Sequence, residues 1–299
     1  MKKNEVCPLC KSKEYFIVDR IEVSKIVNEY HSKAKVNHFF WNLKEIKRLE
    51  CINCWLMFFD YIIEWDSDYY SKISWWYKYY SIKKWDFDIA LETIKQYKPD
   101  SILEIWCGNW YFLEKLPNVI KTIAGNELNK SAIEECEKKW IKIIDLDNKD
   151  EHWKYDMIVT FQVFEHINDA HKMIQKSYDL LRNWWIFLLA VPSPHWYLWK
   201  VRDFLNLPPH HALWWTKSSF EYLKKYNLEM IDYIEENISY WSFLHYIFHI
   251  QDLPQSAFWK IISKIQKYRL YFRWPTIFDE RKFNIKWHSH IWVFKKDKT

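Results

Sequence analysis

The sequence predicts an α/β fold with a doubly wound, mostly parallel sheet of seven strands, preceded by a small N-terminal region. Two observations predict the sheet. From residue 86 onward, short apolar strand runs alternate with segments of helical spacing, a pattern typical of βαβ units with helices on both faces of a parallel sheet. The 299 residues also suit one domain of about 200 residues plus a small appendage.

The elements follow in order along the chain. The first helix is indicated by apolar residues at helical spacing, Phe87, Ala90, Leu91 and Ile94, and it ends before Pro99. Apolar runs predict strands at 101–105, 119–125, 141–145, 156–161, 186–191, 228–235 and 290–295, and helical spacing predicts helices at 86–98, 110–116, 129–139, 168–182 and 217–226. Residues 240–285 mix aromatic and basic residues at helical spacing. We expect a helical insertion there that packs on the domain, with a lid or weak membrane-surface contact as alternatives.

Charge and hydropathy exclude several classes of protein. The net charge of +5, from 44 basic and 39 acidic residues, is too mild to predict a nucleic-acid partner, which requires clustered positive charge. No apolar run approaches the roughly 18 residues of a membrane helix, and the first residues lack an apolar signal region. We therefore expect a cytoplasmic protein without a transmembrane segment, in which cysteines are metal ligands or free thiols.

Glycine and tryptophan occur in abnormal numbers. The chain has 2 Gly and 21 Trp, whereas an average chain of this length has about 20 Gly. Several Trp stand where a turn or helix end favours glycine, as at Trp55, Trp140 and Trp184. We interpret most of these tryptophans as glycines of the natural protein. Some bacteria read the codon UGA as glycine, another code reads it as tryptophan, and translation with the wrong table produces this pattern. The alternative is a genuinely Trp-rich protein.

Two Cys-x-x-Cys pairs mark the N-terminal region. Cys7 with Cys10, and Cys51 with Cys54, each aim two thiolates at one ion and together complete a tetrahedral shell of four sulfurs. This predicts a zinc ribbon over residues 1–60 whose zinc is structural, with redox cysteines as the alternative. The long spacer, 21–46, is expected to form an inserted hairpin. Residues 61–85 are interpreted as a linker or helical cover, and 86–299 as the main domain.

A strand, turn and helix start follow one another over Ser101–Trp110. With Trp106 and Trp110 read as glycine, Leu103-Glu104-Ile105-Trp106-Cys107-Gly108-Asn109-Trp110 closely resembles motif I of the class I S-adenosylmethionine (SAM)-dependent methyltransferases, of the methyltransferase-23-like type. The resemblance implies a Rossmann-like fold and a SAM site in which the backbone of residues 106–110, Cys107 and Gly108 included, approaches the cofactor. Glu104 would then meet its cationic methionine end.

Three further segments extend the resemblance in family order to residue 192. Glu127, 19 residues after Gly108, closes the next strand, where a carboxylate can accept both ribose hydroxyls. The segment Lys154–Ile167 resembles the family's fourth-strand region and contains the turn Phe164-Glu165-His166. It places Gln162 near the cofactor and Asp156 in a structural role. The segment Leu180–Pro192 resembles the turn and fifth strand. Asp147 or Asp145 is expected to accept from the adenine amine.

Histidines are the candidates for deprotonating the methyl acceptor. Histidine is the natural base at neutral pH, and His210 and His211 lie on a Pro-fixed loop, Leu207–Leu213, after the predicted fifth strand. His166 is a further candidate. Packing of the two loop histidines, or capping of a turn by His166, is the structural alternative.

The sequence therefore predicts transfer of a methyl group from SAM to an O or C atom of a small molecule, such as a sugar, a quinone-like compound or a secondary metabolite. A zinc-ribbon binding protein with a degenerate Rossmann-like domain is the alternative. A nicotinamide-dependent oxidoreductase is disfavoured, because the glycine turn lacks the dinucleotide order of residues and contains Glu104.

Overall fold

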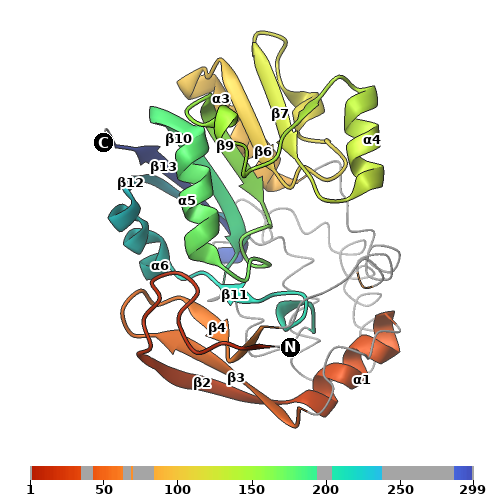
Figure 1. The fold of residues 1–299 in the computed structure, drawn as a ribbon, viewed down its shortest axis with the longest axis vertical. Helices are drawn as coiled ribbons and strands as arrows, with labels where there is room; N and C mark the ends of the chain where they lie inside the picture. The colour runs from red at the N-terminus through yellow and green to blue at the C-terminus, as the bar shows by residue number, and fades with distance from the viewer. Residues whose placement is uncertain are drawn as a thin grey trace, which may run out of the picture.

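The computed structural model describes residues 2–34, 43–62, 69, 84–193, 204–237 and 286–297. The predicted insertion at 240–285 and most of the predicted linker at 61–85 lie outside these residues. Within them, a seven-stranded sheet forms the main body and a four-stranded sheet carries the cysteine pairs (Figure 1).

The large sheet confirms the predicted fold class. Its strands are β6 (Ser101–Ile105), β7 (Thr122–Asn126), β8 (Lys142–Ile143), β9 (Tyr155–Phe161), β10 (Leu181–Pro192), β12 (Leu228–Asn237) and β13 (Lys286–Lys296). They are ordered β12-β13-β10-β9-β6-β7-β8. The pairs β10–β9, β9–β6, β6–β7 and β7–β8 are parallel. Strand β13 runs antiparallel to both β10 and β12. The chain adds β7 and β8 on one side of β6 and then β9 and β10 on the other, so the topological switch point lies between β6 and β9.

Helices cover both faces of this sheet. Alternate residues of a strand point to opposite faces, and in β6 the side chain of Ile102 packs with the core of helix α3 (Trp85–Tyr97), whereas Leu103 packs with helix α5 (Ala170–Leu180). Helix α4 (Lys130–Lys138) contributes Cys136 to the α3 side. The short helix α6 (Lys217–Glu221) and the 3-10 helix η5 (Tyr222–Tyr226) belong to the α5 side.

A buried carboxylate joins the starts of the central strands. Asp156, 2% exposed, accepts hydrogen bonds from the backbone N–H groups of Asp100 and Ser101 at 2.9 and 3.0 Å, and from Arg182 at 2.8 Å. These contacts fix the register of β6 against β9 at the end of the sheet opposite the switch-point loops. They agree with the structural role predicted for Asp156.

The N-terminal sheet is not confined to the first 60 residues. Strands β2 (Tyr15–Glu22), β3 (Glu45–Cys51) and β4 (Met57–Phe59) pair antiparallel, and β11 (Leu213–Trp214) completes the sheet beside β4. A separate two-stranded pairing joins β1 (Lys2–Lys3) to β5 (Tyr61–Ile62). The segment that directly follows His210 and His211 is therefore part of the N-terminal sheet.

Two predicted elements are wrong. The spacer at 21–46 was expected to be a hairpin, but it contains helix α1 (Val23–Ala34). Val23, Ile26 and Tyr30 are buried together in one cluster, which is a helical rather than a strand period. The helix predicted at 110–116 is only a 3-10 turn, η1 (Leu113–Lys115), because Trp110 has a left-handed backbone and Pro117 follows closely. Two further 3-10 turns are η2 (Lys149–Glu151) and η4 (Phe204–Asn206).

Tryptophans hold most of the left-handed backbone positions. Among the described residues, positive φ at non-glycine residues occurs at Lys11, Trp55, Lys98, Trp106, Trp110, Trp140, Trp153, Gln162, Trp184 and Asn227, six of them Trp. A non-glycine residue in this region costs about 1 kcal/mol, so six tryptophans cost roughly 6 kcal/mol. That is comparable with the net stability of about 5–15 kcal/mol of a whole protein.

Trp140 illustrates what these positions require. Its N–H donates to the carbonyl of Glu137 at 3.0 Å, and the next N–H, of Ile141, donates to Cys136 at 3.1 Å. These two bonds form a Schellman motif, whose left-handed residue is usually glycine. Trp140 has φ 61° and is 95% exposed, so its indole contributes little packing.

Replacement of tryptophan by glycine should change stability with opposite sign at two kinds of site. Trp140→Gly should raise the free energy of unfolding by about 1 kcal/mol, because it removes left-handed strain without loss of packing. Trp215→Gly should lower it by about 3–5 kcal/mol, because Trp215 is 1% exposed and its indole N–H donates to the carbonyl of Phe164 at 3.0 Å. Denaturant unfolding measures both; a destabilised Trp140→Gly variant would contradict the interpretation of Trp140 as a glycine position.

Candidate functional site

The turn after β6 has left-handed backbone at three alternate residues. Trp106, Gly108 and Trp110 have φ values of 55°, 51° and 55°. The turn is closed by the N–H of Cys107, which donates to the carbonyl of Asn126 in β7, and by the N–H of Trp110, which donates to the carbonyl of Cys107. The backbone therefore follows the glycine turn predicted from the sequence, although two of the three positions carry indoles.

The indoles of Trp106 and Trp110 pack against the cores on opposite faces of the sheet. Trp106 is partly buried against the core on the α5 side, and Trp110 against the core on the α3 side. The indole nitrogen of Trp110 is buried and has no hydrogen-bond partner within the described part of the chain. An indole N–H normally finds a partner when buried, so Trp110 fits its surroundings poorly.

Glu104 is a buried acid at the end of β6. It is 4% exposed, and its Oε2 atom has no hydrogen-bond partner among the described residues. Burial raises the pKa of Glu104 well above its usual range, and nearby Lys84 partly opposes this shift. A buried carboxyl without a partner is costly, and a cationic ligand group above the turn would supply the missing partner.

Glu127 connects the turn to the next βα unit. One carboxylate oxygen accepts from the N–H of Gly108 at 2.8 Å, and the other accepts from the N–H groups of Leu128 and Asn129 at 2.6 and 2.8 Å. Gly125 precedes it in β7, and a Cβ atom there would lie 2.6 Å from the sulfur of Cys107. Cys107 is 6% exposed, so its role is to pack closely beneath the turn.

Gln162 lies at the carboxyl end of β9 in a left-handed conformation, with φ 57°. Its backbone N–H donates to the carbonyl of Ala190, and its amide donates to Ser289 at 3.3 Å. A hydrogen bond from Gln162 also reaches Asp86, a buried acid at the start of α3 whose pKa is raised by burial. The strained backbone and the buried acid mark this strand end as a candidate site.

Asp147, the first acid considered for adenine, contacts helix α5. It is exposed and its carboxylate forms a 2.6 Å ion pair with Lys176 of α5, which lowers the pKa of Asp147. Asp145, the other acid considered for adenine, accepts from the N–H of Asp147 at 2.9 Å. The role of either acid toward adenine stays a prediction.

The structure brings the three predicted histidines together. A ligand nitrogen from each of His166, His210 and His211 lies within 4.8 Å of the others, and all three side chains are buried. His166 is held by its Nδ1 atom, which lies 2.5 Å from the carbonyl oxygen of His210. The rings of His210 and His211 stack with centroids 5.0 Å apart.

Glu165 adds a carboxylate to this group. It is 2% exposed, and its Oε1 atom lies 3.8 Å from His166 Nε2 and 4.0 Å from His211 Nε2. Burial raises the pKa of Glu165 to about 8 and lowers the pKa of His166 to about 4. Burial also lowers the pKa of His210 well below its usual value. Near neutral pH, His166 and His210 are therefore uncharged.

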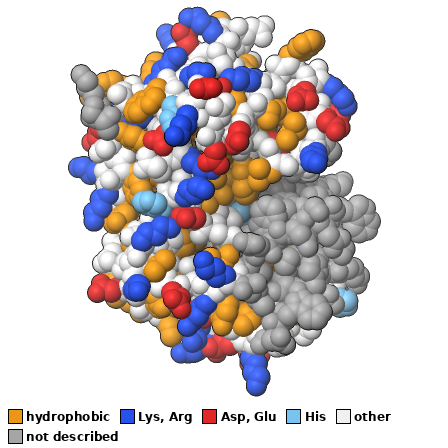
Figure 2. All heavy atoms as spheres, viewed as in Figure 1, with side chains coloured by type: hydrophobic (Ala, Val, Ile, Leu, Met, Phe, Trp, Pro, Cys, Tyr) orange, Lys and Arg blue, Asp and Glu red, His pale blue; other side chains and the backbone are white. Residues whose placement is uncertain are grey.

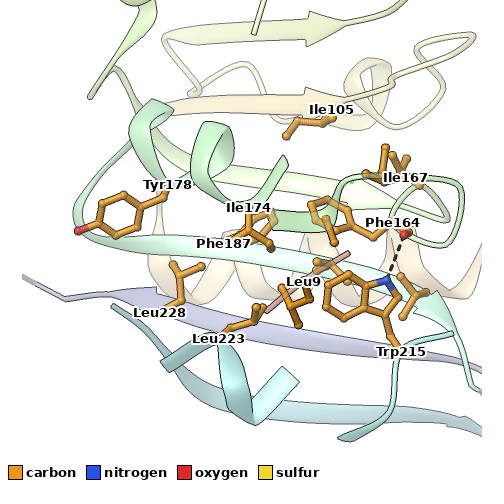
Figure 3. Close-up of a cluster of buried hydrophobic side chains, with 14 of the residues drawn as sticks. Leu9, Ile105, Phe164, Ile167, Ile174, Tyr178, Phe187, Trp215, Leu223 and Leu228 are labelled. Carbon is orange, nitrogen blue, oxygen red and sulfur yellow. Dashed lines mark hydrogen bonds between the residues drawn. The ribbon is translucent and has the colours of Figure 1, made fainter. Parts of the chain in front are cut away.

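The loop that carries His210 and His211 is fixed from three sides. The carbonyl of Glu165 accepts from the N–H groups of Ala212 and Leu213 at 2.7 and 3.0 Å. Tyr30 of α1 donates to the carbonyl of Leu207 at 3.0 Å. On the far side Trp215 donates to the carbonyl of Phe164, and this bond is drawn dashed in Figure 3.

The four cysteines of the two pairs also meet. The sulfurs of Cys7, Cys10, Cys51 and Cys54 lie within 4.8 Å of one another. The sulfur of Cys7 is 3.4 Å from that of Cys54, and the sulfur of Cys10 is 3.4 Å from that of Cys51. Zinc–sulfur bonds of about 2.3 Å place tetrahedral thiolates about 3.8 Å apart, so the four sulfurs fit a zinc ion. Each pair ends in a left-handed residue, Lys11 or Trp55, whose N–H donates to the first cysteine's carbonyl.

The cysteine region packs on the main domain. Leu9 lies among Ile174, Phe187 and Leu223 in the shared core (Figure 3). Polar contacts border this core, with Tyr226 donating to the carbonyl of Leu9 at 2.9 Å and Thr216 donating to that of Trp55 at 3.0 Å.

The surface shows no dominant charge on the face in view. Figure 2 shows basic and acidic side chains interspersed over the described part of that face. Among the described residues, no helix is long and apolar enough to cross a membrane.

Sequence reasoning missed two acids of the site. Glu165 lies in the turn Phe164-Glu165-His166, from which only His166 was chosen as a candidate. The signal for Glu165 was an acid beside a histidine, directly after a buried strand. Asp86 was assigned only to the first helix, and its burial depends on Gln162 and the α3 fold, which no local pattern shows.

Comparison with known proteins gives one family match. The methyltransferase domain family matches residues 77–233, which is more than half of the chain. A comparison with curated proteins finds no match.

Among solved structures, the chain is similar to the YcgJ protein of Bacillus subtilis, with 14% identity, a TM-score of 0.46, and 72% of this chain and 99% of that one covered. It is also similar to coclaurine N-methyltransferase bound to N-methylheliamine and SAH, with 12% identity, a TM-score of 0.45, and 71% and 70% covered. A SAM-dependent methyltransferase from Archaeoglobus fulgidus gives 14% identity, a TM-score of 0.42, and 70% and 94% covered.

The chain belongs to the methyltransferase domain family, on the strength of the domain match. Its seven-stranded sheet is the Rossmann-like fold expected of the class. The turn after β6, Gln162 and the histidine cluster all follow the carboxyl ends of β6, β9 and β10, where open α/β sheets bind their ligands.

Proposed function

We propose that this protein transfers a methyl group from SAM to an O or C atom of a small molecule. The observation that carries the proposal is the turn at 106–110, which has left-handed backbone at three alternate residues and follows the strand that carries Glu104. Glu104 is buried, and its Oε2 atom has no hydrogen-bond partner among the described residues. A turn without Cβ atoms lets backbone N–H groups approach a ligand, and the carboxyl offers a partner for a cation.

The residues at this edge of the sheet divide into two groups. We assign Glu104, Cys107, Gly108, Glu127 and Gln162, together with positions 106 and 110, to the cofactor, and Asp147 to its adenine. SAM carries its methyl group on a cationic sulfonium, and transfer needs the acceptor in line with it. We assign His166, His210 and His211 to the acceptor side.

Positions 106 and 110 must be glycine for this function. The backbone angles support glycine there, and the same argument extends to Trp55, Trp140, Trp153 and Trp184. Trp215 and Trp292 are fully buried and lack positive φ. We propose that these two are authentic tryptophans, whereas the six left-handed ones are glycines of the natural protein.

The cysteine cluster is proposed to hold a structural zinc. Four thiolates close the coordination shell and leave no position for a substrate. A hydrogen bond with Cys54 lowers the pKa of Cys7, which favours the thiolate form that binds metal ions. Because Leu9, within the first knuckle, packs in the main core, the metal would stabilise the domain contact as well as the ribbon.

Binding of SAM tests the function. In a chain with glycine at 106 and 110, Glu104→Gln should weaken SAM binding by about 10- to 100-fold, because it removes a charge-assisted contact worth about 1.5–3 kcal/mol. Titration calorimetry measures the affinity. The exposed Glu114→Gln variant is the control and should bind SAM normally. Binding of NADH with no binding of SAM would overturn the proposal.

The pH dependence of SAM binding should identify Glu104 as the contact. Burial raises the pKa of Glu104 in the free protein, and a bound cation lowers it, so binding releases a proton. Affinity should therefore increase as the pH rises toward the raised pKa of the free Glu104 carboxyl, whereas the Glu104→Gln chain should show no such increase. Calorimetry in two buffers with different ionisation enthalpies counts the protons released when SAM binds. An equal number released by the chain with Glu104 and by the Glu104→Gln chain would argue against Glu104 as the contact.

Cobalt substitution tests the zinc site. The Co²⁺-loaded chain should show thiolate-to-cobalt charge-transfer absorption in the near ultraviolet, because four thiolates form the site. Cys54→Ser should reduce this band and lower the melting temperature. Cys136→Ser, outside the cluster, is the matched control. An unchanged band in Cys54→Ser would contradict the four-sulfur site.

A further inference from the structure

The group formed by Glu165, His166, His210 and His211 combines the ligand atoms that transition metals prefer. Imidazole nitrogens and a carboxylate bind divalent first-row metals such as Zn²⁺ and Fe²⁺. All four residues are buried, with residue exposures of 2%, 4%, 3% and 8%. They belong to only two segments, the turn after β9 and the loop before β11, so one pair of backbone segments positions the whole group.

The spacing of the ligand atoms is close to that of a metal centre. The three imidazoles lie within 4.8 Å of one another, and Glu165 Oε1 lies 3.8 and 4.0 Å from His166 and His211. Metal–nitrogen bonds of about 2.1 Å place tetrahedral ligand atoms about 3.4 Å apart. Closing the difference, up to about 1.4 Å, requires rotations of the side chains on a fixed backbone.

The tautomer of His166 suits coordination. Its Nδ1 lies 2.5 Å from the carbonyl oxygen of His210, and a carbonyl can only accept, so Nδ1 carries the proton. The lone pair is then on Nε2, the nitrogen that faces Glu165 Oε1. Metal-binding histidines commonly donate their second ring N–H to a backbone carbonyl in this way.

Glu165 supplies an independent sign of a missing cation. Both of its carboxylate oxygens are buried, and neither has a hydrogen-bond partner among the described residues. Buried carboxylates are normally hydrogen-bonded, paired with a cation or bound to a metal. A divalent ion between Glu165 and the imidazoles would satisfy the carboxylate.

We propose that Glu165, His166, His210 and His211 bind one divalent first-row transition-metal ion, separate from the zinc of the cysteine cluster. The two sites differ in chemistry, with three nitrogens and one oxygen here and four sulfurs there. One part of the proposal rests on the proposed function: an oxygen of the methyl acceptor would be an additional ligand, because Glu165 and His166 follow the carboxyl end of β9, as Gln162 does.

The two sites can be counted separately with cobalt. The full-length chain, free of any purification tag, is titrated with Co²⁺ and then analysed for bound metal. We expect two ions per chain, of which only one produces the thiolate charge-transfer band, while the other produces weak visible bands typical of nitrogen and oxygen ligands.

Single substitutions assign the second ion. Glu165→Gln and His211→Gln should each weaken its binding by more than about 100-fold, since loss of even an outer-shell partner costs 10- to 100-fold, and should leave the charge-transfer band intact. That intact band also reports that the chain is folded. His152→Gln, outside the cluster, is the control and should retain both ions.

Two outcomes would overturn the proposal. One is binding of a single ion accounted for by the thiolate band. The other is a second ion that persists in Glu165→Gln and His211→Gln with unchanged affinity. Metal counting requires neither SAM nor a methyl acceptor, so failure of the metal site and failure of the proposed methyl transfer are distinguishable.

Discussion

The close turn that follows β6 is the constraint on which the rest of the site depends. It needs left-handed backbone at residues 106, 108 and 110, and it is held by the bond of Cys107 to β7 and by the carboxylate of Glu127. Gly125 lets Cys107 pack beneath it, because a Cβ atom at 125 would clash with the sulfur. Glu104 is buried below the same turn. Side chains at 106 and 110 oppose this arrangement, and glycine would relieve it.

The second organising feature is the loop between η4 and β11. It carries His210 and His211 and then enters the N-terminal sheet as β11. The same loop receives a hydrogen bond from Tyr30 of α1 and binds the carbonyl of Glu165 through Ala212 and Leu213. The N-terminal region therefore positions the histidines in addition to carrying the cysteine cluster. The pairing of β11 with β4 joins this loop to the sheet that carries the cysteine cluster.

The sequence predicted the seven strands of the large sheet, because their apolar runs are buried between helices on both faces. It also predicted the sets of histidines and cysteines that the structure brings together. It failed where the backbone departs from regular periods. The helix predicted at 110–116 does not form, because Trp110 has a left-handed backbone. A helix stands where a hairpin was predicted, because Val23, Ile26 and Tyr30 are buried together on one face of α1. Glu165 stood beside His166 after a buried strand, but its burial, like that of Asp86, is a result of tertiary packing, which a local pattern does not contain.

The most direct test of the central claim is a SAM titration that compares the chain as printed with its Trp106→Gly/Trp110→Gly variant. We expect SAM binding by the double variant, and binding weaker by at least about 100-fold, or none, by the chain with both indoles, because a side chain at either position keeps the backbone of the turn from approaching the cofactor. Equal affinity of the two chains, or failure of the folded double variant to bind SAM, would contradict the account.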